Sequence, residues 1–393
     1  NIRKVMRKIG KTLIGLILSV FFILVKSTEA QTPITGCTVI TSSGEYYLAN
    51  DIIAPRESIC IDIQANNVIL DCQGHTIDGA GAENGAYGIQ VYRSVSTITN
   101  IIIKNCVLRG LNTGLWLEHA DYNTLTNITL NSNWVGLVLW SLNSNTLVNI
   151  ITNSNYYAIY LSYSNFNTLT NITTLSNNWD GLHLYNSSYN TLINVTAKFN
   201  VDFGLFLHYS NFNTLTNIIT NSNFGPGLAL YESHFNTITN SQFHDNGKPY
   251  PYPVAPLCGI YLESSGNNTF YNNLFNNTVN VQFGGNVYAN YWNTTLQIGR
   301  RIGGNYWTNP NGTGYSDTCV DANQDGFCDE PYDLLGDGTN VDYLPYSKYI
   351  PPTTTTTLPP TTTTTTLPPP VNITTPIDLI TFFFTPFFFL IVL

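Results

Sequence analysis

The stretch NTLTNITLNSNWVGLVLW, residues 123–140, is followed by two close copies, NTLVNIITNSNYYAIYLS from residue 145 and NTLTNITTLSNNWDGLHLY from residue 167. Asparagine is frequent in all three copies, although it weakens both helices and ordinary strands. The phrase N-T-[LI]-x-N begins six times at steps of 22 or 23 residues, and a looser copy begins at Asn268. A fixed period of this length indicates stacked structural units.

A second phrase, G-[LI]-x-L, keeps the same step and alternates like a half-buried strand. The segments between the phrases are β-prone and show no helical periodicity, which argues against a leucine-rich horseshoe. A sandwich or a propeller would need hairpin turns and longer periods. The sequence therefore predicts an all-β parallel β-helix, a solenoid of about ten coils with N- and C-terminal caps.

The repeated asparagines have a physical role in such a stack. Equivalent residues of successive coils lie ~4.8 Å apart, and a side-chain amide both donates and accepts hydrogen bonds. Stacked asparagines can therefore form ladders, although solvated turn residues would explain one of the two columns equally well. The first expected ladder runs through Asn123, Asn145, Asn167, Asn190, Asn213 and Asn236, and the second through Asn127, Asn149, Asn171, Asn194, Asn217 and Asn240.

The chain divides into six predicted parts. They are a signal peptide at 1–30, an N-terminal cap at 31–65, β-helix repeats at 66–302, a C-terminal cap with an acidic loop at 303–350, a Thr/Pro-rich stalk at 351–376 and a hydrophobic anchor at 377–393. The first part has a basic region, an apolar run and small residues before Gln31, although an uncleaved anchor is the alternative. The hydrophobic segment at 377–393 is predicted to be a membrane anchor, and a tail that is removed on lipid attachment is the alternative.

The composition is typical of a β-rich surface protein, and the N-terminal segment indicates export. Only 10% of the residues are charged and the net charge is −9, so a nucleic-acid partner is not expected. Seven cysteines are present, and export permits disulfides. Spacing favours the pairs Cys37 with Cys60, Cys72 with Cys106 and Cys319 with Cys328, with Cys258 left over, although spacing alone does not fix connectivity. N-x-[ST] sequons permit glycosylation, but those at Asn127, Asn171 and Asn194 coincide with a predicted ladder and are expected to be accidental.

The outward positions of the G-[LI]-x-L strands carry many aromatic residues. A strip of flat rings at regular spacing could stack on sugar rings, with Glu and His as hydrogen-bond partners. The simpler alternative is that aromatic residues favour strands, or that a loop covers the strip. The predicted ligand-binding residues are Trp116, Glu118, Trp140, Tyr160, His183, Tyr185, Phe206, His208, Tyr231, Tyr261 and Glu263.

The acidic loop is the best candidate for a metal site. Its sequence D-A-N-Q-D-G at 321–326 matches the first half of an EF-hand loop. Position twelve is Tyr332 instead of Glu, so full EF-hand geometry is not expected, and a plain acidic turn is the alternative. The predicted ligands of a structural calcium ion are Asp321, Asn323, Asp325, Phe327 through its carbonyl, and Asp329.

The phrase NNVILDCQGHTIDGAG at 66–81, followed by YGIQV and the G-[LI]-x-L coils, resembles right-handed parallel β-helix repeat proteins, in particular NosD-like and archaeal cell-surface proteins. GGNYW at 303–307 and the acidic segment after it resemble the end of NosD-type domains. The resemblance implies a right-handed β-helix. It also implies copper, but the single Met and the six scattered His of this chain argue against a copper site.

We therefore predict an exported, cell-surface-anchored, non-catalytic protein that binds polysaccharide or cell-surface glycan and is held to the membrane by its C-terminal anchor. The first alternative is a polysaccharide lyase or glycoside hydrolase. The acids of the coils are few and none forms a D-D pair in the sequence, so we assign no catalytic residue. The second alternative is a passive envelope or spacer protein.

Overall fold

The computed structural model describes residues 31–81, 85–94, 96–249, 256–297 and 302–347. The predicted signal peptide, the Thr/Pro stalk and the hydrophobic anchor lie outside these residues. Within them, no helix is both long and apolar enough to cross a membrane.

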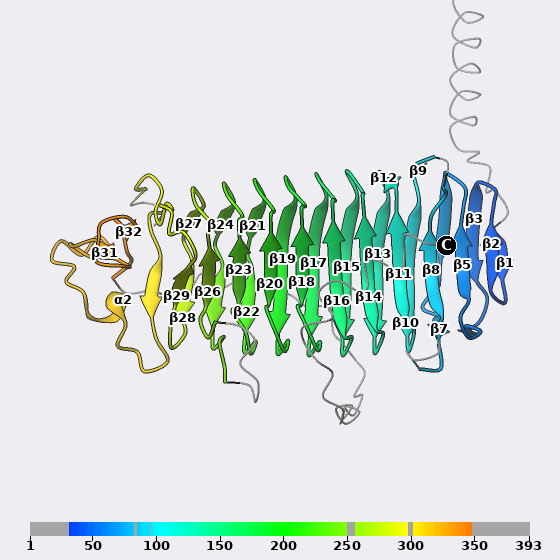
Figure 1. Ribbon diagram of the computed structural model, residues 1–393, viewed down its shortest axis with the longest axis horizontal. Helices are drawn as coiled ribbons and strands as arrows, with labels where there is room; N and C mark the ends of the chain where they lie inside the picture. The colour runs from blue at the N-terminus through cyan, green and yellow to red at the C-terminus, as the bar shows by residue number, and fades with distance from the viewer. Residues whose placement is uncertain (1–30, 82–84, 95, 250–255, 298–301, 348–393) are drawn as a thin grey trace, which may run out of the picture. The chain divides into compact units, whose positions relative to one another are not determined.

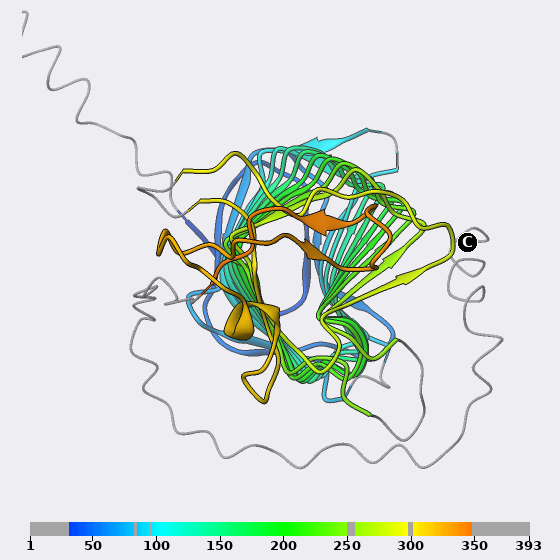
Figure 2. The ribbon, with the colours of Figure 1, turned by 90° about the vertical axis from the view of Figure 1, so that its left-hand side faces the viewer.

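The described chain winds into a right-handed parallel β-helix with almost no helix (Figure 1, Figure 2), which confirms the predicted fold class. Two parallel sheets form its walls. Sheet A has 17 strands: β1 (Thr32–Ile34), β3 (Gly44–Leu48), β4 (Ile52–Ile53), β6 (Val68–Asp71), β7 (Thr76–Asp78), β10 (Ile102–Arg109), β13 (Thr124–Asn131), β15 (Thr146–Asn153), β17 (Thr168–Leu175), β19 (Thr191–Lys198), β21 (Thr214–Thr216), β22 (Ile219–Asn221), β24 (Thr237–Thr239), β25 (Gln242–His244), β27 (Thr269–Tyr271), β28 (Leu274–Asn276) and β30 (Tyr306–Thr308).

Sheet B has 11 strands, which contain the G-[LI]-x-L phrases and the YGIQV segment: β2 (Thr38–Ile40), β5 (Ile59–Ile63), β8 (Tyr87–Val91), β11 (Thr113–Glu118), β14 (Val135–Trp140), β16 (Tyr157–Ser162), β18 (Leu182–Tyr185), β20 (Leu205–His208), β23 (Leu228–Tyr231), β26 (Ile260–Glu263) and β29 (Val281–Gly284). The remaining elements are short: the parallel pair β9 (Ile98–Thr99) and β12 (Ala120–Asp121), the antiparallel pair β31 (Tyr332–Asp333) and β32 (Val341–Asp342), and helix α2 (Tyr315–Thr318).

The first predicted ladder is confirmed and runs through the interior. The backbone N–H of Asn123 donates to Asn145 Oδ1 at 2.8 Å, and the same contact recurs on every coil to Asn236 at 2.8–2.9 Å. The side-chain amides also bond along the column, and these asparagines are at most 1% exposed. The ladder continues beyond the predicted set through Asn268, Asn290 and Asn340.

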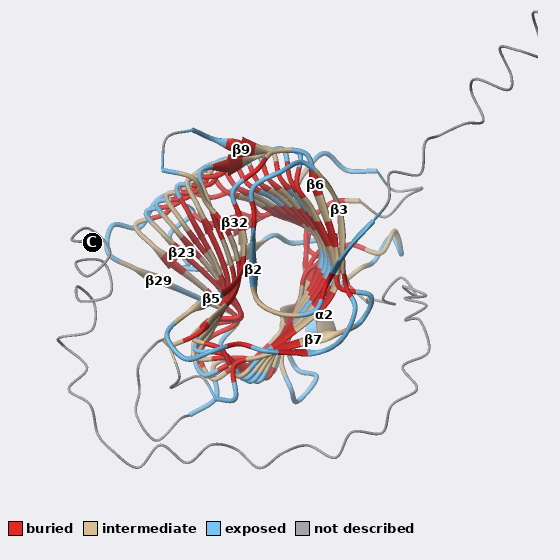
Figure 3. Cartoon of the chain, turned by 90° about the vertical axis from the view of Figure 1, so that its right-hand side faces the viewer, coloured by how far each residue is buried: buried red, intermediate tan, exposed pale blue. Residues whose placement is uncertain are grey.

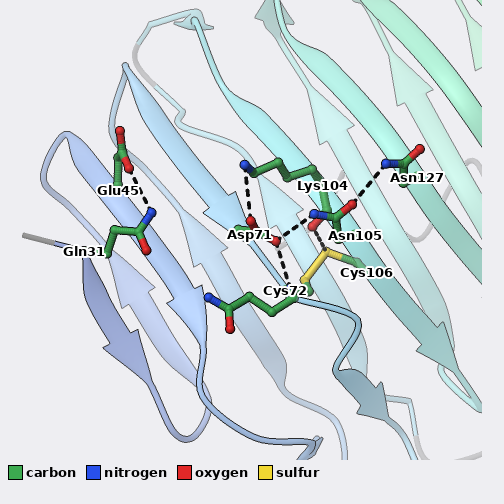
Figure 4. A network of polar contacts seen from close by, with 9 residues as sticks. Gln31, Glu45, Asp71, Cys72, Lys104, Asn105, Cys106 and Asn127 are labelled. Carbon is green, nitrogen blue, oxygen red and sulfur yellow. Dashed lines mark hydrogen bonds and ion pairs between the residues drawn. A yellow bond between two sulfur atoms is a disulfide. The ribbon is translucent and has the colours of Figure 1, made fainter. Parts of the chain in front are cut away.

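The second predicted ladder forms on the surface from Asn127 to Asn217, but the prediction was wrong for Asn240, whose amide donates to Thr239 Oγ1 instead of to Asn217. Each amide donates to the Oδ1 of the preceding coil at 2.9–3.1 Å from Asn127 through Asn217, and Figure 4 shows the N-terminal start of the column at Asp71 and Asn105. These residues have φ near +55°, the left-handed conformation that asparagine tolerates, and they bend the long strands of sheet A. The argument that burial makes the sequons at Asn127, Asn171 and Asn194 accidental is therefore wrong, because all three are exposed.

Two further ladders escaped prediction, although each repeats one residue type at the period of the coils. One is a buried column of asparagines, Asn133, Asn155, Asn177, Asn200, Asn223 and Asn246, which bond Oδ1 to backbone N–H. The other is a buried column of serines, Ser164, Ser187, Ser210, Ser233 and Ser265, which use their hydroxyl oxygens in the same way. Buried backbone groups at the turns therefore find partners.

Aliphatic side chains fill the interior between the sheets. Figure 3 shows that buried residues recur along both sheets from coil to coil. Both apolar residues of each G-[LI]-x-L phrase are at most 1% exposed, from Leu115 through Leu262. Close approach of the coils favours glycine in the phrase, since a Cβ at Gly204 would lie 2.5 Å from the carbonyl oxygen of Gly227, although Ala158 occupies the same position in one coil. At the C-terminal end the filling becomes aromatic, with Phe270 stacked on Trp292 and Phe275 on Trp307 at centroid distances of 4.5 and 4.4 Å.

The two ends of the solenoid are built differently. Residues 31–65, predicted as a cap, form β1 to β5, and these strands pair in the same parallel sheets as the repeats. At the other end, Asn340 accepts the backbone N–H of Asn290 at the end of the first ladder, and Asp342 accepts the backbone N–H of Asn305. Asp342 is fully buried, and its burial raises its pKa to about 7. The C-terminal segment therefore satisfies the polar edge of the last coil.

The three predicted disulfides are present, Cys37–Cys60, Cys72–Cys106 and Cys319–Cys328, and Cys258 is a buried free thiol. Figure 4 shows that Cys72–Cys106 joins neighbouring coils beside the start of the exposed ladder. Burial raises the pKa of the Cys258 thiol to about 12, so it is inert as a nucleophile.

Candidate functional site

The predicted aromatic strip lies on the outer face of sheet B, from β11 to β26. Its register is the predicted one, because Trp116 pairs with Val138, Val138 with Tyr160, and Tyr160 with His183, while Glu118, Trp140, Ser162 and Tyr185 form the second column. All eleven predicted ligand-binding residues are half-buried at these outward positions. The structure thus brings them together on one surface, while their role in binding stays a prediction.

The rings of the strip touch one another along the long axis of the solenoid. Successive centroid distances are 4.9 Å for Tyr160–His183, 4.4 Å for His183–Phe206, 5.0 Å for Phe206–Tyr231 and 5.4 Å for Tyr231–Tyr261. The second column contributes Tyr185–His208 at 5.2 Å. The side chain of Glu263 accepts a hydrogen bond from the Tyr261 hydroxyl. Rings held by their neighbours lose little conformational freedom when a ligand binds.

Two aspartates lie buried in the middle of the strip. Asp180 and Asp202 precede the strands β18 and β20 on adjacent coils, and they are 3% and 5% exposed. Asp180 Oδ1 accepts the backbone N–H of Phe203 at 3.2 Å, and Asp180 Oδ2 lies 3.1 Å from His183 Nδ1 without forming an aligned hydrogen bond. Three buried atoms here have no hydrogen-bond partner among the described residues: Asp180 Oδ2, Asp202 Oδ1 and His183 Nε2.

Burial shifts the protonation of this cluster toward neutral forms. It raises the pKa of the Asp180 carboxyl, and burial together with the nearby charge of Asp180 raises the pKa of Asp202. It lowers the pKa of His183 to about 3, so the imidazole is neutral and does not compensate the carboxylates. Burial also lowers the pKa of His208 to about 4. Two coupled carboxyls that resist double ionisation hold a proton near neutral pH.

The sequence interpretation missed this cluster because it looked for acids adjacent in the sequence. Asp180 directly precedes Gly181, whereas Asp202 lies two residues before Gly204, so the two aspartates are 22 residues apart where the glycines are 23 apart. Residues one period apart meet on adjacent coils. Searching for acids about one period apart, with a tolerance of one residue, would have found the pair.

Two aromatic stacks outside the strip were also missed. Trp134 stacks on Tyr156 at 4.2 Å, and Tyr156 lies 6.2 Å from Trp179, the residue before Asp180. A second, exposed stack of Phe166, Tyr189, Phe212 and Phe235 lies at the turn before the buried asparagine ladder, with centroids 4.9–5.1 Å apart. The first stack borders the buried aspartates, whereas the second lies at the turns that lead into sheet A.

The acidic loop of the C-terminal region is closed by its own amides. Asp321 accepts the backbone N–H groups of Asp325 and Gly326 at 3.1 Å, and Asp325 accepts that of Phe327 at 3.0 Å. Asp329 accepts the N–H of Ala322 at 3.0 Å, and Asn323 donates to Asp325. In the part of the chain that the structure describes, no three His, Cys, Asp or Glu residues gather to hold a metal. Calcium in this loop stays a prediction.

The sequence matches the family described as periplasmic copper-binding protein (NosD) over residues 23–217 and 143–312, so the chain belongs to the NosD family. No curated protein matches it. Among solved structures, the A-module of the mannuronan C-5 epimerase AlgE4 from Azotobacter vinelandii is similar over 66% of this chain and 80% of that chain, with a TM-score of 0.50 and 15% identity.

The Dettilon tailspike protein is similar over 70% of this chain and 60% of that chain, with a TM-score of 0.50 and 11% identity. At these identities both likenesses show the β-helix fold alone.

Copper, which the family description names, does not fit the donors of the described residues. Six of the seven cysteines are in disulfides, and Cys258 is buried with a raised pKa. The sequence has one methionine, Met6, which lies outside the described residues. Copper(I) prefers thiolate and thioether ligands, and the described residues offer no accessible set of them.

Proposed function

We propose that the chain binds polysaccharide along the outer face of sheet B. The observation that carries this proposal is the unbroken contact of half-buried rings from Tyr160 to Tyr261 on successive coils. A sugar ring has apolar C–H faces that pack on aromatic faces, while its hydroxyls need hydrogen-bond partners. An extended glycan lying along the solenoid axis would meet both on this surface.

Unsatisfied polar atoms of the strip support a polar ligand. The indole Nε1 of Trp116 and the Nε2 of His183 are buried atoms without a hydrogen-bond partner among the described residues. A buried polar group without a partner costs about 1–3 kcal/mol, and a bound hydroxyl at either position would recover part of that cost. Glu118 and Glu263 add acceptors at the two ends of the strip.

The setting of this activity is outside the cytoplasm. The NosD family is described as periplasmic, and three disulfides fit an oxidising compartment. The Thr/Pro stalk and the C-terminal apolar segment, both outside the described residues, would hold the binding face away from a membrane. Display on the cell surface is therefore part of the proposal.

The test is co-sedimentation of the purified chain with insoluble polysaccharides, and affinity electrophoresis with soluble ones. The variant Trp116→Ala, Trp140→Ala, Tyr185→Ala should bind at least tenfold more weakly than the native chain. The matched control is Tyr189→Ala, Phe212→Ala, which removes two exposed stacked rings elsewhere and should bind normally. Equal binding by the strip variant, or no binding of the native chain to any glycan, would refute the proposal and favour a passive spacer.

A further inference from the structure

The charged side chains on the outer face of sheet B are all acids. The strands of this sheet, as the structure describes them, contain Asp62 in β5, Glu118 in β11 and Glu263 in β26, and they contain no Lys or Arg. Asp62 leads into the first column of the strip through Gln90, which pairs with Trp116. Glu118 and Glu263 stand at the two ends of the second column.

Positive charge is found in other parts of the described chain. Its six Lys and Arg residues lie either in strands of sheet A or in connections between strands; they are Lys104, Arg109 and Lys198, and Arg56, Arg93 and Lys248. The two imidazoles of the strip do not supply positive charge, because burial lowers the pKa of His183 to about 3 and that of His208 to about 4. The strip therefore offers ring surfaces, hydrogen-bond acceptors and negative charge.

The two buried aspartates extend this pattern to the middle of the strip. Asp180 and Asp202 precede β18 and β20, and no Lys or Arg of the described chain forms an ion pair with either. A carboxyl contributes negative charge or none. Measured along the solenoid axis, every coil of the strip lies within about two coils, ~10 Å, of one of these aspartates or of a terminal glutamate. That distance is about the Debye length at 0.1 M salt, so an anionic sugar on any coil would be repelled.

The strip is long enough for several sugar units. Its seven strands, β11, β14, β16, β18, β20, β23 and β26, follow one another in parallel register (Figure 1). Six steps of ~4.8 Å give a length of roughly 29 Å. An extended chain of six-membered sugar rings, joined by equatorial bonds at opposite ends of each ring, advances by a similar distance per unit. Such a chain could place about one sugar on each coil.

We propose that the strip takes an extended neutral polysaccharide and excludes polyanionic ones, with Glu118 and Glu263 as specificity-determining residues at its two ends. This inference rests on the proposed binding function. A neutral chain packs its C–H faces on the rings and directs its hydroxyls to the acceptors. A carboxylate or sulfate group on the sugar would lose water on the ring surface, approach the acids and find no cation in the strip to compensate. Specificity then arises from repulsion of the wrong ligand as well as from attraction of the right one.

The experiment compares polysaccharides that share a backbone and differ in charge. The pairs are β-mannan and mannuronan, hydroxyethyl and carboxymethyl cellulose, and methyl-esterified and de-esterified galacturonan. Affinity electrophoresis and titration calorimetry with the purified full chain give the ratio of the two dissociation constants in each pair. His119 Nε2 lies 3.8 Å from Glu118 Oε1, so binding is measured at about pH 8, where an ordinary imidazole is neutral.

We expect the neutral member of at least one pair to bind at least about tenfold more tightly than its acidic counterpart at low ionic strength. Added salt should narrow this ratio because it screens the repulsion. The variant Glu118→Gln, Glu263→Gln should narrow the ratio at least about threefold. The ratio is the readout because a lost hydrogen-bond acceptor would weaken both members of a pair alike. The matched control Glu45→Gln, Glu57→Gln removes the same charge from sheet A and from the turn before β5, and it should leave the ratio unchanged.

Neutral oligosaccharides of increasing length give a second readout. Their affinity should rise up to about six or seven units, the length of the strip, and then level off. Equal or tighter binding of the acidic members, or a ratio that neither salt nor the Gln variant changes, would overturn the specificity and leave the binding proposal standing. A plateau at about two or three units would show that the ligand does not extend along the strip. Absence of binding to every polymer would refute both proposals.

Discussion

The buried asparagine ladder makes a quantitative prediction for Asn190. Its side chain accepts from the backbone and the amide of Asn167 at 2.8 and 3.1 Å, and donates to Ser164 O and Asn213 Oδ1 at 3.0 and 3.2 Å. The substitution Asn190→Ala removes all four contacts in a site that is 1% exposed. The backbone N–H of Asn167 and the carbonyl of Ser164 lose these partners at a place that water does not reach.

The expected cost follows from those two groups. A buried donor or acceptor left without a partner costs about 1–3 kcal/mol, so two such groups cost roughly 4 kcal/mol in the free energy of unfolding. The cavity left by the amide adds to this value. The loss is large compared with the total stability of about 5–15 kcal/mol that is usual for a folded domain.

The matched control is Asn171→Gly in the exposed ladder. It removes two side-chain hydrogen bonds of 3.0 Å, and glycine accepts the φ of 56° found there without strain. Water can replace both bonds, so the cost should be about 1 kcal/mol or less.

Guanidinium unfolding followed by tryptophan fluorescence and circular dichroism would measure both variants. Agreement of the two probes is needed because solenoids can unfold stepwise. Amide hydrogen exchange at Asn167 gives a local check. If Asn190→Ala costs no more than Asn171→Gly, burial does not make the ladder important and the reasoning fails.

Three further predictions concern pH, disulfides and calcium. Burial raises the pKa values of Asp180 and Asp202 from 3.8 to about 8, so the folded state binds more protons than the unfolded state between these values. The free energy of unfolding should therefore fall as pH rises from about 5 to 8, and the double variant Asp180→Asn, Asp202→Asn should flatten that fall. An unchanged slope in thermal unfolding of the variant would contradict this prediction. Replacing Cys72 and Cys106 by Ser removes a disulfide with a sequence separation of 34 and should lower the free energy of unfolding by roughly 4 kcal/mol. The control Cys258→Ser should leave the sensitivity of unfolding to reductant unchanged. A double variant as stable as the native chain would show that the disulfide contributes nothing to stability. Calcium is expected to raise the melting temperature relative to excess chelator, with Asp325→Asn abolishing the difference; identical melting temperatures would contradict a calcium site in the acidic loop.

Much of the architecture could be predicted because a solenoid is nearly one-dimensional. Each coil contacts only its neighbours, so the repeat period alone determines which residues stack, and the columns from Asn123 and from Trp116 follow directly. The disulfides follow for a related reason, because Cys72 and Cys106 end two parallel phrases and meet on adjacent coils. Local conformation was less accessible. The N-T-L-T-N phrase did not indicate which of its two asparagines faces the interior and which lies on the surface at positive φ.

The sequence by itself determined the fold class, the register of the coils, the two asparagine columns and the outward aromatic strip, because all of these depend only on the period and on side-chain alternation. Only the tertiary structure decided burial and charge. It placed Asn127 at the surface, left the acidic loop closed on its own amides, and buried Asp180, Asp202 and His183 with one polar atom each that has no hydrogen-bond partner among the described residues. Those outcomes depend on which groups exclude water from one another, and solvent exclusion is a property of the packed coils that no single repeat contains.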